Sequence, residues 1–120
     1  MPTSVYRHLG VRKQGDIIVV RFGEHRLLDE RAVERLGDEL YSVADRADCQ
    51  KLLLNFASVE GITSMMLGKL VMIQKKMNAK GGKLKLCDLA PEVQEVFAAT
   101  KLNQIFDILE SEGEGVAAFA

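Results

Sequence analysis

The sequence predicts an α/β fold in which a mixed, mainly parallel sheet is flanked by helices. Strand-like and helix-like segments alternate after an opening pair of strands, and such alternation is typical of layered α/β domains. Residues 51–56 form a short, almost continuous apolar run, as expected for a strand buried on both faces of a parallel sheet. The opening pair has the pattern of a hairpin, which would add one antiparallel pairing.

The N-terminal part predicts this hairpin and then a helix. Residues 5–14 have the pattern of a partly polar strand, Gly15 and Asp16 that of a turn, and Ile17–Phe22 that of a strand rich in β-branched residues. A helix is expected over residues 29–47, with Asp29 as its N-cap. Its apolar positions recur at helical spacing and are Val33, Leu36, Leu40, Val43, Ala44 and Ala47.

A second helix is expected over residues 64–80. Its apolar residues recur at i, i+4, i+7 and i+11, which places them on one face. These residues are Met66, Leu70, Ile73 and Met77. Gly81 and Gly82 follow, and we assign them the left-handed C-cap of the helix and no role in binding phosphate.

The C-terminal third predicts shorter elements. Residues 83–89 alternate at first and then become apolar, as in a strand. Pro91 fits the first position of an amphipathic helix that runs to about residue 100. Residues 105–108 predict a last short strand, and residues 113–120 a loose turn and terminal helix.

Length and composition predict one soluble domain over residues 1–120. Chains of 120 residues have the usual size for a single hydrophobic core. Hydrophobic residues make up 48% and charged residues 28%, which is the ordinary balance of a globular protein. Cys49 and Cys87 lie far apart without C-x-x-C spacing, so we interpret them as reduced, apolar thiols.

Charge and hydropathy argue against two kinds of partner. Sixteen Lys and Arg against seventeen Asp and Glu give a net charge of −1, so no basic field is present to hold a nucleic-acid backbone. No apolar run approaches the roughly 20 residues that a membrane-spanning helix needs. The N-terminus lacks the layout of a secretory signal. We therefore expect a cytoplasmic protein that binds no nucleic acid and does not insert into a membrane.

Three stretches carry a resemblance to a known family. Residues 53–68 close a buried strand with a short loop and open a helix in which Ser64, Leu67 and Gly68 match the pattern Asp-Ser-Ser-Gly-Leu-Gly in register. Residues 81–86 and 89–93 match a Gly-Gly turn with its strand and a Leu-Ser-Pro-Glu-Val helix opening. The chain thus resembles the STAS family, the sulfate transporter and anti-sigma factor antagonist domains. The resemblance covers most of the chain and implies a STAS-type fold.

The resemblance also implies a function. Antagonists of this type bind an anti-sigma factor serine kinase and so release a sigma factor, and the kinase phosphorylates the Ser that follows the family's Asp. Ser64 is the residue here that matches this phosphoacceptor. Thr63 stands where the family usually has Asp, Met65 and Met66 replace Ser-Gly, and Asn55 replaces an Asp common at the strand end.

These departures favour an alternative within the same family. A STAS domain can act as a scaffold of the stressosome type, or as an accessory subunit of a lipid ABC transporter, and neither role needs phosphorylation. For the antagonist, the expected partner-binding residues surround the start of the second helix. They are Gly61, Ile62, Thr63, Ser64, Met65, Gly68 and Met72.

The chemistry of a helix start is compatible with a switch at Ser64. A helix N-terminus has unpaired N–H groups and a positive dipole end, so it tolerates a phosphate. A phosphoserine adds about −1.5 to −2 charges, which would act mainly on a protein bound at that surface. The alternative is that Ser64 serves only as the N-cap.

The helical wheel adds two further expectations. Ser64, Gly68 and Lys75 share the face opposite the apolar stripe, so Gly68 would leave room for a close approach by a partner. Met65 and Met72 lie beside that stripe, where they either extend the contact surface or pack under a neighbouring helix.

Signals of catalysis are weak. His8 and His25 are the only histidines, and no Cys, Asp or Glu joins them at metal-ligand spacing. The sequence contains no P-loop, dinucleotide-binding or nucleophile-elbow motif. Asp88 beside Cys87 lies at a strand end, where α/β folds often bind ligands, but one carboxylate makes no mechanism. We therefore expect a binding protein without enzymatic activity, cofactor or metal, whose oligomeric state the sequence leaves open.

Overall fold

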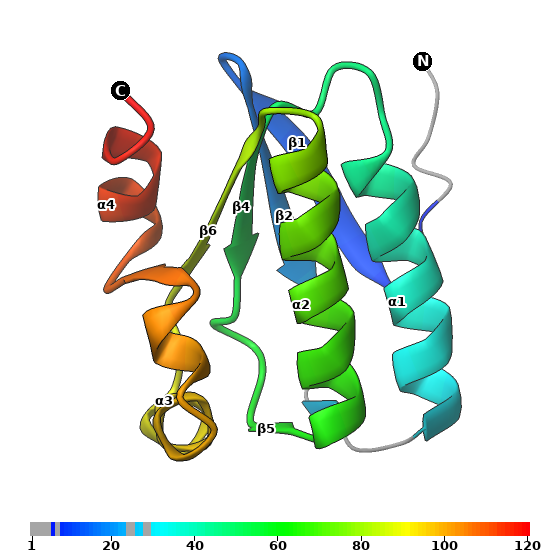
Figure 1. Ribbon diagram of the computed structural model, residues 1–120, viewed down its shortest axis with the longest axis vertical. Helices are drawn as coiled ribbons and strands as arrows, with labels where there is room; N and C mark the ends of the chain where they lie inside the picture. Colours follow the sequence, from blue (N-terminus) through cyan, green and yellow to red (C-terminus); the bar gives the residue numbers. More distant parts are fainter. Residues whose placement is uncertain (1–5, 7, 24–25, 28–29) are drawn as a thin grey trace.

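A five-stranded sheet forms the centre of the protein in the computed structural model (Figure 1), which describes residues 6, 8–23, 26–27 and 30–120. The strands lie in the order β1 (Leu9–Gln14), β2 (Ile17–Phe22), β4 (Lys51–Asn55), β6 (Lys83–Cys87) and β7 (Asp107–Leu109). β1 and β2 are antiparallel and every other pair in this sheet is parallel. The predicted mixed, mainly parallel sheet is therefore confirmed.

Helices of unequal size cover the two faces of the sheet. α1 (Glu30–Ala44) and α2 (Ser64–Ala79) stand side by side on one face, and α3 (Pro91–Ala99) lies at the lower left of the view, on the far side of the β4–β5 connection from α2 (Figure 1). This face holds the main core. The core includes the rings of Phe97, in α3, and Phe106, just before β7, whose centroids lie 5.7 Å apart. α4 (Glu112–Ala117) and Phe119 cover a smaller cluster on the other face.

The central strands explain why the sheet needs cover on both sides. Leu52 and Leu54 face the main core, whereas Leu53 faces the α4 side, and all three are fully buried. An apolar run without alternation is the pattern expected for such a strand. The expectation from residues 51–56 is confirmed, although the strand itself ends at Asn55.

Several predicted boundaries differ from the structure. α1 ends at Ala44 and not near Ala47, β6 ends at Cys87 and not at Leu89, and the last strand is Asp107–Leu109 rather than 105–108. Pro91 does begin α3, and the terminal helix is present as α4 with Ser111 as its N-cap. The expected strand start at residue 5 and the expected N-cap Asp29 lie outside the described residues.

The paired glycines end α2 as expected. Gly81 has a φ of +73°, its N–H donates to the Asn78 carbonyl at 3.1 Å, and the Gly82 N–H donates to the Met77 carbonyl at 2.8 Å. This pair of bonds is the Schellman motif, in which a left-handed residue allows the chain to turn back over the helix end. The glycines therefore direct the chain into β6.

Two small elements have no counterpart among the predicted ones. β3 (Arg26–Leu27) and β5 (Gly61–Ile62) pair in parallel as a separate two-stranded sheet, and η1 (Leu102–Gln104) is a single 3-10 turn before β7. β5 lies directly before the start of α2 (Figure 1). This small sheet therefore determines where α2 begins.

Candidate functional site

The loop that leads into α2 is anchored at both ends. After β4, the Ala57 N–H donates to Asn55 Oδ1 at 2.7 Å, and Ser58 Oγ donates to the Phe22 carbonyl at 2.6 Å. Val59 is buried, and β5 pairs with β3 immediately afterwards. Because these contacts fix the chain on each side of the turn, the N-terminus of α2 has a defined position.

The N-cap of α2 is Thr63, and Ser64 is the first helical residue. Thr63 has extended backbone angles, its carbonyl accepts the first helical bond from the Leu67 N–H at 3.1 Å, and its side chain makes no capping bond. The alternative that Ser64 serves only as the N-cap is therefore wrong. Thr63 occupies that position because β5 ends one residue earlier.

Ser64 lies on an open surface. Its side chain is exposed, and so is the position one turn later, Gly68. A Cβ added to Gly68 would have no neighbouring atom within 4 Å. The surface next to Ser64 therefore has the open space that was expected at Gly68, and another protein surface can approach the backbone of α2 closely there.

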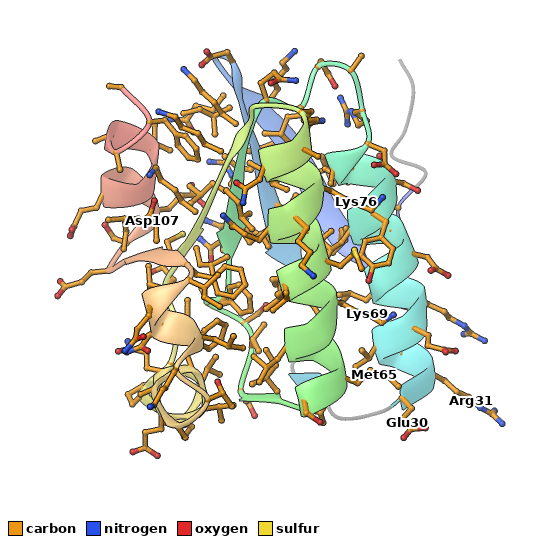
Figure 2. All side chains as sticks on the ribbon, viewed as in Figure 1. Glu30, Arg31, Met65, Lys69, Lys76 and Asp107 are labelled. Carbon is orange, nitrogen blue, oxygen red and sulfur yellow. The ribbon has the colours of Figure 1, made fainter. Side chains whose placement is uncertain are left out.

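A second row, of exposed methionines and half-buried lysines, runs along the side of α2 that faces α1. Met65 and Met72 are 36% and 44% exposed, so the alternative in which they pack under a neighbouring helix is wrong. Lys69 and Lys76 lie between and beyond them at helical spacing, and Figure 2 shows Met65, Lys69 and Lys76 in one line between α2 and α1. We call these four residues the Met–Lys stripe.

The lysines of the stripe are held by α1. The ammonium group of Lys69 lies 5.6 Å from the centroid of the Tyr41 ring, and that of Lys76 lies 5.5 Å from it. Lys76 also forms an ion pair with Asp45 at 3.2 Å. Cation–π contacts of this kind orient a lysine while its charge stays near the surface. Sequence reasoning identified the two methionines but missed both lysines, although the i, i+4 spacing from Met65 and Met72 could have indicated them.

The seven predicted partner-binding residues lie along one continuous segment, in three environments. Ser64, Met65, Gly68 and Met72 are exposed on α2, whereas Gly61 and Thr63 are half-buried and Ile62 is buried. Ile62 pairs with Leu27 in the small sheet. The structure thus groups four of the seven on the surface, and their contact with a partner stays a prediction.

A separate polar cluster surrounds Asn55, which is only 2% exposed. Its amide nitrogen donates to Glu112 Oε1 at 2.9 Å and to Asp88 Oδ2 at 3.2 Å, while its oxygen accepts from the Ala57 N–H. Glu112 also pairs with the guanidinium groups of Arg12 and Arg21. Hydrogen bonding from Arg12 is the main cause that lowers the pKa of Glu112, with help from Asn55. The amide therefore joins α4 to the ends of β4 and β6.

The two thiols are buried and unreactive in character. Cys49 and Cys87 are both free and fully buried. Burial is the main cause that raises both pKa values, and for Cys87, with Asp88 adding to the effect, the pKa reaches about 12. A thiol with such a pKa carries almost no thiolate at neutral pH and is a poor nucleophile. The prediction that the cysteines are reduced, apolar residues is confirmed.

The described residues show neither a metal-binding cluster nor a membrane span. Among residues 6, 8–23, 26–27 and 30–120, no group of three or more His, Cys, Asp or Glu side chains is placed to hold a metal ion. In the same part of the chain, every helix is too short or too polar to cross a bilayer.

The sequence and fold match one family. Residues 8–115 match the STAS domain family, and the chain belongs to it. The family assignment made from Ser64, Leu67, Gly68 and the later motifs is confirmed, and so is the STAS-type fold.

Among curated proteins, two relatives are anti-sigma factor antagonists by name. BtrV of Bordetella bronchiseptica, provisionally named as such an antagonist, is 30% identical over 86 residues, which are 72% of this chain and 73% of BtrV. The anti-sigma F factor antagonist of Paenibacillus polymyxa is 26% identical over 99 residues, 82% of each chain.

Solved structures show the same fold. An anti-sigma-factor antagonist (STAS) domain protein from Planctomyces limnophilus superposes with a TM-score of 0.84 at 23% identity, over 93% of this chain and 97% of that one. The Bacillus cell-fate determinant SpoIIAA in its phosphorylated form gives a TM-score of 0.68 at 18% identity, over 93% of this chain and 99% of that one.

Proposed function

We propose that this protein is an anti-sigma factor antagonist that binds an anti-sigma factor serine kinase through the start of α2 and is switched by phosphorylation of Ser64. The observation that carries the proposal is the exposed hydroxyl of Ser64 at the first position of a helix whose neighbouring turn, at Gly68, is open. Two relatives named as antagonists support the class of function. We further propose that residues 1–120 act as one domain without catalytic activity of their own.

A phosphate at Ser64 fits the local electrostatics. The first N–H groups of a helix lack intrahelical partners, and a negative charge there is favoured by about 0.3–1 kcal/mol. Between residues 64 and 83 there are five lysines and no Asp or Glu. The modification therefore leaves the fold intact and alters only the surface that the kinase contacts.

The partner surface follows from the chemistry of the stripe. Exposed methionines provide adaptable apolar contact area, and the two lysines of the stripe carry positive charge. A complementary kinase surface combines an apolar patch with carboxylates. SpoIIAA has been solved in a phosphorylated form, which supports phosphorylation as a property of this kind of domain.

The test is a kinase assay with an anti-sigma factor serine kinase from the same organism. The protein is incubated with that kinase and ATP, and the added phosphate is located by mass spectrometry. We expect one phosphate on Ser64, none in Ser64→Ala, and weakened kinase binding in Ser64→Asp. Thr63→Ala is the matched control, because Thr63 is the adjacent hydroxyl and its side chain makes no capping bond; this variant should be phosphorylated like the parent.

Two results would contradict the proposal. Phosphorylation that persists in Ser64→Ala and disappears in Thr63→Ala would show that the phosphoacceptor is Thr63 and not Ser64. Kinase binding that is unchanged by Ser64→Asp would remove the switch altogether.

A second candidate function is a STAS scaffold or transporter accessory subunit without phosphorylation. It is favoured by the absence of family carboxylates at two positions. Thr63, the N-cap of α2, stands at one, and Asn55, buried in the cluster with Glu112, stands at the other. A neighbouring ABC permease gene, or elution of the native protein in a large assembly by size-exclusion chromatography with light scattering, would favour this role over the antagonist.

A further inference from the structure

A groove separate from α2 lies between α3 and β7. It encloses about 670 Å³ and is lined on one side by Glu95 and Ala98 of α3 and on the other by Phe106, Asp107 and Ile108. Grooves of this volume are large enough to hold several side chains of a ligand. Figure 2 shows Asp107 at the side of the molecule opposite Met65 and Lys69, so this groove is distinct from the proposed kinase surface.

The strand beside the groove has a free edge. In the sheet formed by the described residues, β7 is the last strand and pairs with β6 alone. An edge strand presents backbone N–H and C=O groups to any extended chain that comes alongside. Ile105, two residues before the strand, is 52% exposed and is the most exposed large apolar residue among those described. The edge therefore combines open backbone groups with an unpaired apolar side chain.

Both charged residues that line the groove, Glu95 and Asp107, are acidic. Residues 88–114 contain seven Asp and Glu and a single basic residue, Lys101, although Asp88 and Glu112 belong to the Asn55 cluster and not to the groove. Asp107 is 69% exposed at its side chain even though Lys85 Nζ lies 3.0 Å from it, and Glu95 is exposed as well. An acidic edge of this kind attracts a positively charged segment and repels an acidic one.

We propose that this groove binds an extended, basic peptide segment of a partner protein, which adds to β7 as a further strand. Along β7, Ile108 packs against the main core, whereas Leu109 packs against the cluster on the α4 face. A chain paired with β7 would place its own side chains alternately on these two faces. Apolar side chains then contact Ile108 and Phe106, and basic side chains lie next to Asp107. The segment recognised is one in which basic and apolar residues alternate.

The experiment uses a synthetic Lys-Val-Lys-Val-Lys-Val peptide and the full chain labelled for NMR. We expect amide shifts to move in α3 and β7 and to stay constant along α2. Glu95→Gln and Asp107→Asn should each weaken binding about twofold to fivefold, the range for solvent-exposed ion pairs. Glu34→Gln is the matched control, because it removes one negative charge from the exposed side of α1, as each test variant does from the groove, and it should leave peptide binding unchanged.

Strand addition is separated from general electrostatic attraction by backbone methylation. Only every second N–H of an added strand faces β7. Methylation of one alternate set of valine or lysine amides should therefore abolish binding, while methylation of the other set is tolerated. Equal binding of both methylated peptides, or of a Glu-Val-Glu-Val-Glu-Val peptide, would overturn the proposal.

A second copy of the chain is the competing occupant. If light scattering detects a dimer that forms with rising concentration and is dissociated by Asp107→Asn, the groove is a self-association surface and the proposal is wrong. The measurement needs no kinase, and Ser64→Asp should bind the peptide like the parent. Failure of one proposal is therefore distinguishable from failure of the other.

Discussion

Replacement of Asn55 by Asp should destabilise the protein strongly at neutral pH, although the two side chains have the same shape. The Asn55 amide nitrogen donates to the carboxylates of Glu112 and Asp88. An Asp side chain has no donor when ionised, so it would place a third carboxylate against the other two in a site that is 2% exposed. Its oxygen can still accept from the Ala57 N–H, so that one bond survives.

The expected cost follows from these contacts. Loss of two bonds to charged acceptors costs about 1.5–3 kcal/mol each where a partner is left buried, and an uncompensated buried charge costs roughly 3–5 kcal/mol in total. Arg12 and Arg21, which pair with Glu112, offset part of this repulsion. We therefore expect a deficit of about 3–4 kcal/mol at pH 7, a large fraction of the roughly 5–15 kcal/mol that stabilises a typical domain.

The deficit should depend on pH in a defined direction. Burial and the two neighbouring carboxylates raise the folded-state pKa of the introduced carboxyl above its unfolded value of about 3.9. The folded variant therefore holds its proton over a wider pH range than the unfolded chain. The deficit is small below about pH 4 and grows by about 1.4 kcal/mol per pH unit until the folded pKa is passed.

Urea unfolding followed by circular dichroism at several pH values measures this difference. Asn55→Ala is the matched control, because it removes the same donor without adding a charge, and its deficit should change much less with pH. The reasoning is refuted if Asn55→Asp is as stable as the parent at pH 7, or if its deficit is the same at pH 4 and pH 7.

Four further predictions concern other parts of the fold. Gly68→Ala should raise the free energy of unfolding by about 0.5–1 kcal/mol, because the new methyl group meets no atom and alanine is the better helix former; the same change should weaken kinase binding if the partner approaches closely there. Gly82→Ala should lower the free energy of unfolding by about 1–3 kcal/mol, because the Cβ would lie 2.8 Å from the Gln50 carbonyl oxygen. The denaturant midpoint should therefore rise for Gly68→Ala and fall for Gly82→Ala. Glu112→Gln should cost about 1–2 kcal/mol at pH 7. Because the folded-state pKa of Glu112 is lowered, the advantage of the parent is present above the ordinary glutamate pKa of 4.5 and is lost as the pH falls through the folded-state pKa. Cys87 and Cys49 should react with a thiol reagent at pH 8 only as fast as the protein opens, and rapid labelling in the native state would contradict their burial.

The parts of the fold that the sequence predicts are those with a local periodic signal. The stripe of Met66, Leu70, Ile73 and Met77 is fully buried, as its spacing indicates, and the Gly81-Gly82 turn has the expected geometry. The pairing of β3 with β5 joins segments about 35 residues apart, and two residues carry no detectable period. The correction at Thr63 follows from that missing element, because the N-cap position depends on where β5 ends.

α1 ends earlier than its apolar pattern predicts, because the contacts at its end come from another helix. The apolar pattern continues to Ala47, but the helix stops at Ala44. Lys80, at the end of α2, donates its ammonium protons to the carbonyl oxygens of Ala44 and Arg46. The Ala44 carbonyl is among the last of α1, which have no intrahelical partners, and a lysine there also interacts favourably with the helix dipole. The Arg46 carbonyl lies just past the helix and also accepts from the Cys49 N–H at 3.1 Å. Such a tertiary cap cannot be detected from the local sequence.

The charge pattern of α2 gives the proposed switch its direction. A surface with lysines and no carboxylates between residues 64 and 83 selects an acidic partner surface, so a phosphate on Ser64 brings a charge of about −1.5 to −2 against like charge. Phosphorylation should therefore weaken kinase binding, and binding of the unmodified protein should fall as salt rises because the attraction is screened over about 10 Å at 0.1 M salt. Lys69→Gln should weaken that binding and reduce its salt dependence, whereas Lys101→Gln, on the far side at η1, should change neither. Tighter binding of the phosphorylated form would show that the kinase surface is basic, and the Met–Lys stripe would then lie outside the interface.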